Sequence, residues 1–178
     1  NGDTRDYGYA YDGVCMYGLG DAGWLWSFDQ FGRTNCAAPP VTCSDAVAID
    51  RGQAAKLLVE NFPITLDTTG APNFGDVPLN YLPEEPYIDT LWNAGITSGC
   101  SAGSPPNFCP TYALTRGAYI VWVVKAYGWP LINPPVPYFT DVPTTHPFYQ
   151  HIETAKAHGI ISGIPNGDGT FKFEPDRT

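Results

Sequence analysis

The chain repeats itself at an interval of 65 residues, and this duplication limits the folds it can adopt more than any other feature. Two related motifs lie at this interval, IDRGQA at residues 49–54 and LTRGAY at residues 114–119. In each, Asp50 or Thr115 precedes an apolar run of helical length, where a short oxygen-bearing side chain can cap the free N–H groups of a first turn. Both motifs therefore predict the start of a helix with one buried face.

Two further motifs recur with nearly the same spacing. FGDVP at residues 74–78 returns as FTDVP at 139–143, and GITSG at 95–99 returns as GIISG at 159–163. One unit thus contains Phe-x-Asp-Val-Pro, a short helix, Gly-Ile-x-Ser-Gly, a loop and a second helix. A fixed period of this kind is the sequence signature of a repeat architecture.

Helices are predicted over about 51–61, 84–94 and 116–127, and from Pro147 until Gly159 closes the last one. Residues 116–127 are rich in β-branched and aromatic side chains, so propensity alone would also allow a strand. The repeat decides in favour of a helix. Residues 1–35 are rich in glycine and aromatic residues, with no motif, and irregular or short-strand structure is expected there.

This order of motifs resembles the S-layer homology repeat of bacterial cell-surface proteins, in which Thr-Arg-Ala-Glu normally opens the second helix. The resemblance implies a mainly α fold of helix-loop-helix units in a pseudo-three-fold bundle. It divides the chain into an aromatic segment, the second half of a repeat with a linker, a complete repeat with a proline-rich connector, and the first half of another repeat. These parts are residues 1–35, 36–73, 74–138 and 139–178.

The resemblance also implies a binding site. In this family, grooves between repeats bind an acidic, often pyruvylated, cell-wall polysaccharide, and the arginine of the Thr-Arg motif is a principal anion contact, which suits the bidentate match of guanidinium to carboxylate. The matching residues are Arg51 and Arg116. Neighbouring contacts are expected from Asp76, Asp141, Ser98, Gly99, Ser162 and Gly163. The alternative is that both arginines form ion pairs with Asp76 or Asp141 between repeats.

The motif departs from the family pattern in both copies. Gly52 and Gly117 stand where alanine is usual, and Gln53 and Ala118 stand where glutamate is usual. Asp50 and Gln53 can still form a reciprocal capping box, whereas Thr115 cannot form one with Ala118.

Five cysteines at paired spacings, with no histidine in the pattern, favour disulfides over a metal site and an oxidising, extracellular setting. Cys36–Cys43 and Cys100–Cys109 are the expected pairs, because they occupy matching positions ahead of the two Arg-Gly helix starts. Cys15 remains over. It is either a buried free thiol or the site of an intermolecular bridge.

The composition argues against several classes of binding partner. A formal net charge of −9 disfavours nucleic acid and anionic membrane surfaces. No apolar run approaches the ~20 residues of a membrane span, so no membrane insertion is expected. The cysteines and the resemblance lead us to expect a secreted cell-surface protein. The N-terminus is not a signal peptide, so the signal of such a protein would have been removed.

No catalytic motif stands out, and neither an enzyme nor a cofactor is expected. There is no Gly-x-Ser-x-Gly, no phosphate-binding loop and no Cys–His pair in a catalytic context. Residues 167–169 (GDG) are interpreted as a turn rather than a calcium loop. His146, His151 and His158 are assigned packing or surface roles rather than metal binding.

Two functional hypotheses follow. The first is a structural extracellular surface protein that assembles into an array or filament as a homo-oligomer. The second is a wall-anchoring module that binds a pyruvylated secondary cell-wall polysaccharide. The half-repeat at 139–178 would leave the apolar face Phe148, Ile152 and Ala155 to be covered, either by Ala54, Leu57 and Leu58 of the same chain or by a neighbouring chain.

Overall fold

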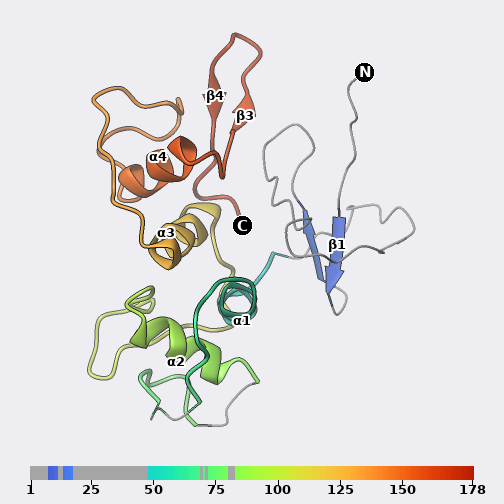
Figure 1. Ribbon diagram of the computed structural model, residues 1–178, viewed down its shortest axis with the longest axis vertical. Coiled ribbons are helices and arrows are strands. Elements are labelled where there is room, and N and C mark those ends of the chain that lie inside the picture. The colour runs from blue at the N-terminus through green and yellow to red at the C-terminus, as the bar shows by residue number, and fades with distance from the viewer. Residues whose placement is uncertain (1–7, 12–13, 18–47, 69, 71, 80–82) are drawn as a thin grey trace. The chain divides into compact units, whose positions relative to one another are not determined.

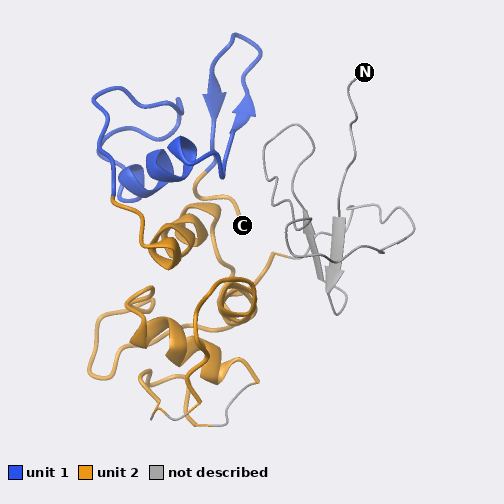
Figure 2. Ribbon diagram, viewed as in Figure 1, with its two compact units in different colours: residues 1–47, 131–174 blue, residues 48–130, 175–178 orange. Residues whose placement is uncertain are grey.

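The structure is a computed structural model of the 178-residue chain (Figure 1). It describes residues 8–11, 14–17, 48–68, 70, 72–79 and 83–178. The chain divides into two compact units, which are coloured separately in Figure 2. Unit 1 comprises residues 1–47 and 131–174, and unit 2 comprises residues 48–130 and 175–178.

The described part of the chain is mainly α-helical, as the sequence predicts. Its helices are α1 (Arg51–Asn61), α2 (Glu85–Asn93), α3 (Arg116–Tyr127) and α4 (Tyr149–Ala157). Its strands are β1 (Gly8–Tyr11), β2 (Val14–Tyr17), β3 (Ile164–Pro165) and β4 (Phe171–Lys172). The strands form two antiparallel pairs, β1 with β2 and β3 with β4. For residues 1–35 the sequence predicts irregular or short-strand structure, and the described parts of this segment are the strands β1 and β2.

The helix starts follow from the capping residues. At α1, the Asp50 carboxylate accepts the Gln53 N–H at 2.8 Å and the Gln53 side chain accepts the Asp50 N–H, which completes the capping box. At α3, the Thr115 hydroxyl accepts the Ala118 N–H at 3.3 Å. Gly128 ends α3 in the left-handed conformation, with φ of 65°. These caps explain why the β-branched segment is a helix.

Unit 2 buries apolar faces from three helices. α1 packs against α2, and the helices contribute side chains at three- and four-residue spacing that are removed from solvent. The buried side chains include Ala54, Ala55, Leu58, Ile88, Leu91, Ile120 and Val123. Phe108, in the loop between α2 and α3, is also fully buried, so this loop is part of the core rather than a surface excursion.

Unit 1 is built around α4 and the β3–β4 hairpin. Its buried side chains include Phe139, Val142, Tyr149, Ile152, Ile161 and Phe173. The hairpin tip is the turn expected at residues 167–169, where Asp168 accepts the Thr170 N–H at 2.9 Å. Ile152 and Ala155 are fully buried in the single chain. The α4 face that the sequence leaves to be covered therefore has cover at these two positions.

Candidate functional site

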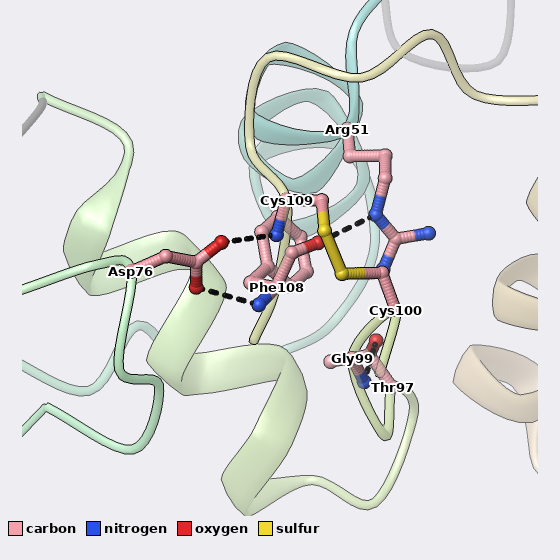
Figure 3. The surroundings of a disulfide bond; sticks show 7 residues. All are labelled: Arg51, Asp76, Thr97, Gly99, Cys100, Phe108 and Cys109. Carbon is pink, nitrogen blue, oxygen red and sulfur yellow. Dashed lines mark hydrogen bonds between the residues drawn. A yellow bond between two sulfur atoms is a disulfide. The ribbon is translucent and has the colours of Figure 1, made fainter. Parts of the chain in front are cut away.

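The aspartate of the Phe-x-Asp-Val-Pro motif shapes a loop. In unit 2, the Asp76 carboxylate accepts the N–H groups of Phe108 and Cys109, both at 2.7 Å (Figure 3). In unit 1, Asp141 accepts the N–H groups of Phe173 at 2.8 Å and Glu174 at 2.7 Å. Each carboxylate thus uses both oxygens to hold two successive backbone amides, 32 and 33 residues away, in one fixed loop conformation.

The second residue of each held pair has an unusual backbone conformation. Cys109 has φ of 59° and Glu174 has φ of 57°, in the left-handed region that side chains other than glycine rarely adopt. Such a conformation persists only where the surroundings impose it. The two hydrogen bonds to the motif aspartate contribute to holding it in both units, so the repeat seen in the sequence is also a repeat of loop geometry.

The glycine that closes the Gly-Ile-x-Ser-Gly motif permits a close approach. Gly99 and Gly163 have φ of 89° and 84°, and a Cβ atom at either position would collide with a neighbour. That neighbour is the carbonyl oxygen of Asn107 in unit 2 and the Phe139 ring in unit 1. Gly99 also donates its N–H to the Thr97 hydroxyl at 3.2 Å (Figure 3).

The first turn of α1 docks on the end of this loop. Arg51 N–H donates to the Tyr112 carbonyl at 3.0 Å, and Gly52 N–H donates to the Pro110 carbonyl at 2.9 Å. α3 repeats the arrangement: Arg116 N–H and Gly117 N–H donate to the carbonyls of Arg177 and Pro175, both at 2.8 Å. First-turn N–H groups have no partner inside a helix, and these carbonyls satisfy two of them at each start.

The Arg51 side chain is held against the same loop. Its Nε donates to the Phe108 carbonyl at 2.8 Å (Figure 3). Its guanidinium lies 4.7 Å from the centroid of the Phe108 ring and 5.1 Å from that of Trp122. Cation–π contacts of this kind favour the charged form and fix the plane of the group. The loop therefore positions the cation through both a carbonyl and two aromatic faces.

The guanidinium charge is not neutralised by the motif aspartate. Within the residues that the structure describes, Arg51 has no ion pair, and the Asp76 carboxylate accepts from the loop amides instead. Burial lowers the pKa of Arg51 and the charge of Asp76 raises it, and arginine remains protonated under such opposing effects. One terminal nitrogen, Nη2, is shielded from solvent without a hydrogen-bond partner among these residues.

The structure brings one of the two predicted residue sets together in one unit. Arg51, Asp76 and Gly99 adjoin the 97–109 loop of unit 2, and Ser98 of this loop is exposed. The second set is divided between the units: Arg116 belongs to unit 2, and Asp141, Ser162 and Gly163 belong to unit 1. A shared site for that second set stays a prediction.

The predicted disulfide Cys100–Cys109 is confirmed, with the two Cα atoms 6.0 Å apart. It closes the loop that carries Phe108 (Figure 3). Cys36 and Cys43 lie outside the described residues. Cys15 lies in β2, but its side chain is outside the description, so its bonding stays a prediction.

Sequence reasoning missed a pair of buried polar residues in each repeat. In α2, Asp89 Oδ1 accepts the Asn73 N–H at 3.1 Å, and the Thr90 hydroxyl accepts the Asp67 N–H at 2.9 Å. In α4, Glu153 Oε1 accepts the Tyr138 N–H at 2.9 Å, and the Thr154 hydroxyl accepts the Ile132 N–H at 3.1 Å. All four acceptor residues are at most 4% exposed. The matching acid-threonine dipeptide in both repeats was the available signal.

These pairs fix the chain that leads into each Phe-x-Asp-Val-Pro motif. They hold the residues immediately before Phe74 and Phe139 in place. The backbone that carries each motif aspartate therefore starts from a fixed position. The partners of Arg51 were also missed. Phe108 and Trp122 are far from Arg51 in the sequence, and no local pattern links them to it.

Comparisons with known proteins agree with the motif analysis. The family model for the S-layer homology domain matches residues 138–177. A protein of Bacillus anthracis named an uncharacterized cell wall amidase is 32% identical over 89 residues, which is 50% of this chain and 16% of that relative. Residues 138–177 thus match an S-layer homology domain, which indicates association with the cell surface or cell wall. None of the helices in the described residues has the length and apolar character of a bilayer-spanning segment.

Proposed function

Because residues 138–177 match the S-layer homology domain and the motif around Arg51 resembles the same family, we propose that this chain is a wall-anchoring module that binds an acidic cell-wall polysaccharide through Arg51. The observation that carries the proposal is the state of that guanidinium: charged, held in place by the Phe108 carbonyl and two rings, and without an ion pair among the described residues. A carboxylate on the polymer, such as that of a pyruvyl group, is the matching ligand chemistry.

Local positioning has to overcome an unfavourable overall charge. The chain has a formal net charge of −9, so an anionic polymer is repelled at long range. At physiological ionic strength the Debye length is about 8 Å, and distant carboxylates on the protein contribute little to contact energy. A fixed guanidinium acts at hydrogen-bonding distance, where that screening is weak. The cost of ordering the arginine side chain is already met by its contacts with the loop.

The proposal is tested by sedimentation with cell-wall sacculi that carry the polysaccharide. Arg51→Ala removes a charge-assisted contact and is expected to lower affinity at least about tenfold. Arg51→Lys keeps the charge but loses the planar guanidinium that the Phe108 carbonyl and the two rings position, and its affinity is expected to fall between those of wild type and Arg51→Ala. Lys56→Ala is the matched control, because it removes the same charge further along α1. Removal of pyruvate from the sacculi should abolish the difference between wild type and Arg51→Ala. Equal binding by both proteins to untreated sacculi would refute the proposal.

A second candidate, self-assembly at the cell surface, is favoured by one observation. The connector before α4 exposes a run of apolar side chains: Leu131 (45% exposed), Ile132 (39%), Val136 (75%) and Tyr138 (41%). Contiguous apolar exposure is typical of interaction surfaces. We propose the connector as the surface for contact between copies. The pseudo-three-fold packing of the repeats also stays a prediction.

We propose no catalytic role for this chain. The amidase named above shares only 16% of its length with the matched segment. The described residues around Arg51 supply a positioned cation and loop amides, which are binding elements rather than a nucleophile with its base.

A further inference from the structure

We propose that the Cys100–Cys109 disulfide is a positioning element of the Arg51 site, and that its reduction by a dithiol weakens polysaccharide binding while the chain stays folded. This inference rests on the proposed function. It concerns the loop that presents the Phe108 carbonyl to Arg51, and the observation behind it is that the two repeats fix the same loop by different means.

In unit 2, Phe108 is fixed from both sides. The N–H groups of Phe108 and Cys109 are held by Asp76, and the Cys100 N–H donates to the Asn107 carbonyl at 2.7 Å. The disulfide joins the two ends of this arrangement, since it links Cys100 to the left-handed Cys109. The carbonyl of Phe108, which accepts from Arg51 Nε, lies between these constraints (Figure 3).

In unit 1, the corresponding loop is held without a covalent bond. The strands β3 and β4 pair Ile164 with Lys172, and the Lys172 ammonium lies 2.5 Å from the Glu174 carboxylate. Glu174 takes the place of Cys109, with the same left-handed backbone and the same hydrogen bond to the motif aspartate. A hairpin and an ion pair thus do here what the disulfide does in unit 2.

Besides the Asp76 hydrogen bonds, the burial of Phe108 and the bond from the Gly75 N–H to the Pro106 carbonyl at 2.8 Å, the unit 2 loop lacks, within the described residues, a strand pairing like that of β3 and β4. It contains Pro105 and Pro106, which cannot donate to a strand ladder, and its strand-like pairing is the isolated bridge between Ser101 and Asn107. A glutamate at position 109 would also add a negative charge directly after Phe108, whose carbonyl accepts from Arg51 Nε, and this charge would disfavour an anionic ligand. A disulfide fixes the left-handed residue without adding that charge.

Reduction is chemically accessible. Cys100 is exposed, so a dithiol can attack the bridge. The dithiol gives two electrons and two protons, the Cys100–Cys109 bond breaks into two thiols, and the reductant becomes a cyclic disulfide. The Phe108 carbonyl then gains freedom to move away from Arg51 Nε, and the guanidinium samples orientations that do not fit the ligand carboxylate. We expect a loss of affinity of about tenfold.

The experiment measures binding of the full chain to sacculi carrying the polysaccharide, with and without dithiothreitol, for wild type and for Cys100→Ser/Cys109→Ser. Wild type should lose about tenfold in affinity on reduction, and the double variant should show the reduced affinity under both conditions. The double variant also controls for the other cysteines, because a reductant effect that persists in it comes from elsewhere. Lys172→Met, which breaks the ion pair of the corresponding loop in unit 1, is the matched structural control and should bind as wild type.

The outcomes separate this inference from the proposed function. If Arg51→Ala weakens binding but full reduction of Cys100–Cys109, verified by mass spectrometry, does not, the disulfide has no positioning role. If Arg51→Ala itself has no effect, the proposed function fails. Circular dichroism is recorded in parallel. Unfolding of the wild-type chain by dithiothreitol alone would also refute the inference, because the bridge would then support the fold rather than the site.

Discussion

Gly99 tests the loop at the level of a single residue. Gly99→Ala should destabilise the fold for two reasons: the backbone φ is 89°, and the added Cβ would collide with the Asn107 carbonyl. We expect a loss of about 3 kcal/mol in the free energy of unfolding, measured by urea denaturation. Gly95→Ala is the matched control: φ is 68°, nothing lies within 4 Å of its Cβ, and only the conformational cost of about 1 kcal/mol remains. Equal losses would show that close approach is not what selects glycine at position 99.

Glu153 is the residue whose ionisation should register in stability. Burial raises its pKa above the ordinary 4.5, against the lowering effects of the Tyr138 N–H and Lys156. A carboxyl with a raised native pKa contributes stability at pH values below its unfolded pKa, and this contribution is lost as pH rises through the native value. Glu153→Gln keeps an oxygen for the Tyr138 N–H and removes the buried charge.

Thermal melts from pH 4 to pH 7.5 compare the stability of wild type with that of Glu153→Gln. We expect the variant to be at least as stable as wild type at pH 7 and its advantage to shrink toward pH 4, where the wild-type carboxyl is protonated. A variant clearly less stable than wild type at pH 7 would mean that the attraction between Glu153 and Lys156 outweighs desolvation.

At the level of elements, the start of α1 can be improved. Gly52 lies in the first turn, and a Cβ there would meet Asp50 and Pro110 at 3.5 Å, which is ordinary van der Waals contact. Gly52→Ala, the residue usual in the resembling family, should raise the free energy of unfolding by about 0.5–1 kcal/mol because alanine loses less backbone entropy in a helix. Gly52→Val is the control, because the branched side chain of valine extends toward Pro110. The valine variant should therefore not show the gain in stability that is expected of alanine. Destabilisation by alanine would contradict this packing.

Elements were predictable where their signals are local. Asp50 and Thr115 mark the starts of α1 and α3, and the structure begins both helices at the following arginine. α4 starts at Tyr149, two residues after Pro147, because the preceding residues form turns in which the Tyr149 N–H donates to the His146 carbonyl. The Arg51 surroundings could not be predicted this way, since their partners lie 57 residues or more along the chain.

The motif aspartate shows the same limit at a finer level. The family resemblance implied a residue close to the arginine, and the charge of Asp76 does act on the pKa of Arg51. Its hydrogen bonds, however, go to amides 32 and 33 residues away. Loop closure over that distance is set by tertiary packing around Phe108, which no pattern of spacing encodes.

At the scale of the whole molecule, the open question is contact between copies. Ile152 and Ala155 of α4 are buried in the single chain, so the exposed connector is the surface to test. Leu131→Ser/Val136→Ser removes two apolar side chains that are 45% and 75% exposed, so stability should change by no more than about 0.5 kcal/mol for each substitution.

We expect size-exclusion chromatography with light scattering to give wild-type masses that rise above 19.3 kDa with concentration, and the double variant to remain at 19.3 kDa. Burial of apolar area is the driving force, so high salt should not dissolve the assembly. Sacculus binding by the variant should be unchanged, because Arg51 and its loop lie in the other unit. A wild type that is monomeric at every concentration would rule out assembly through the connector and leave anchoring as the function.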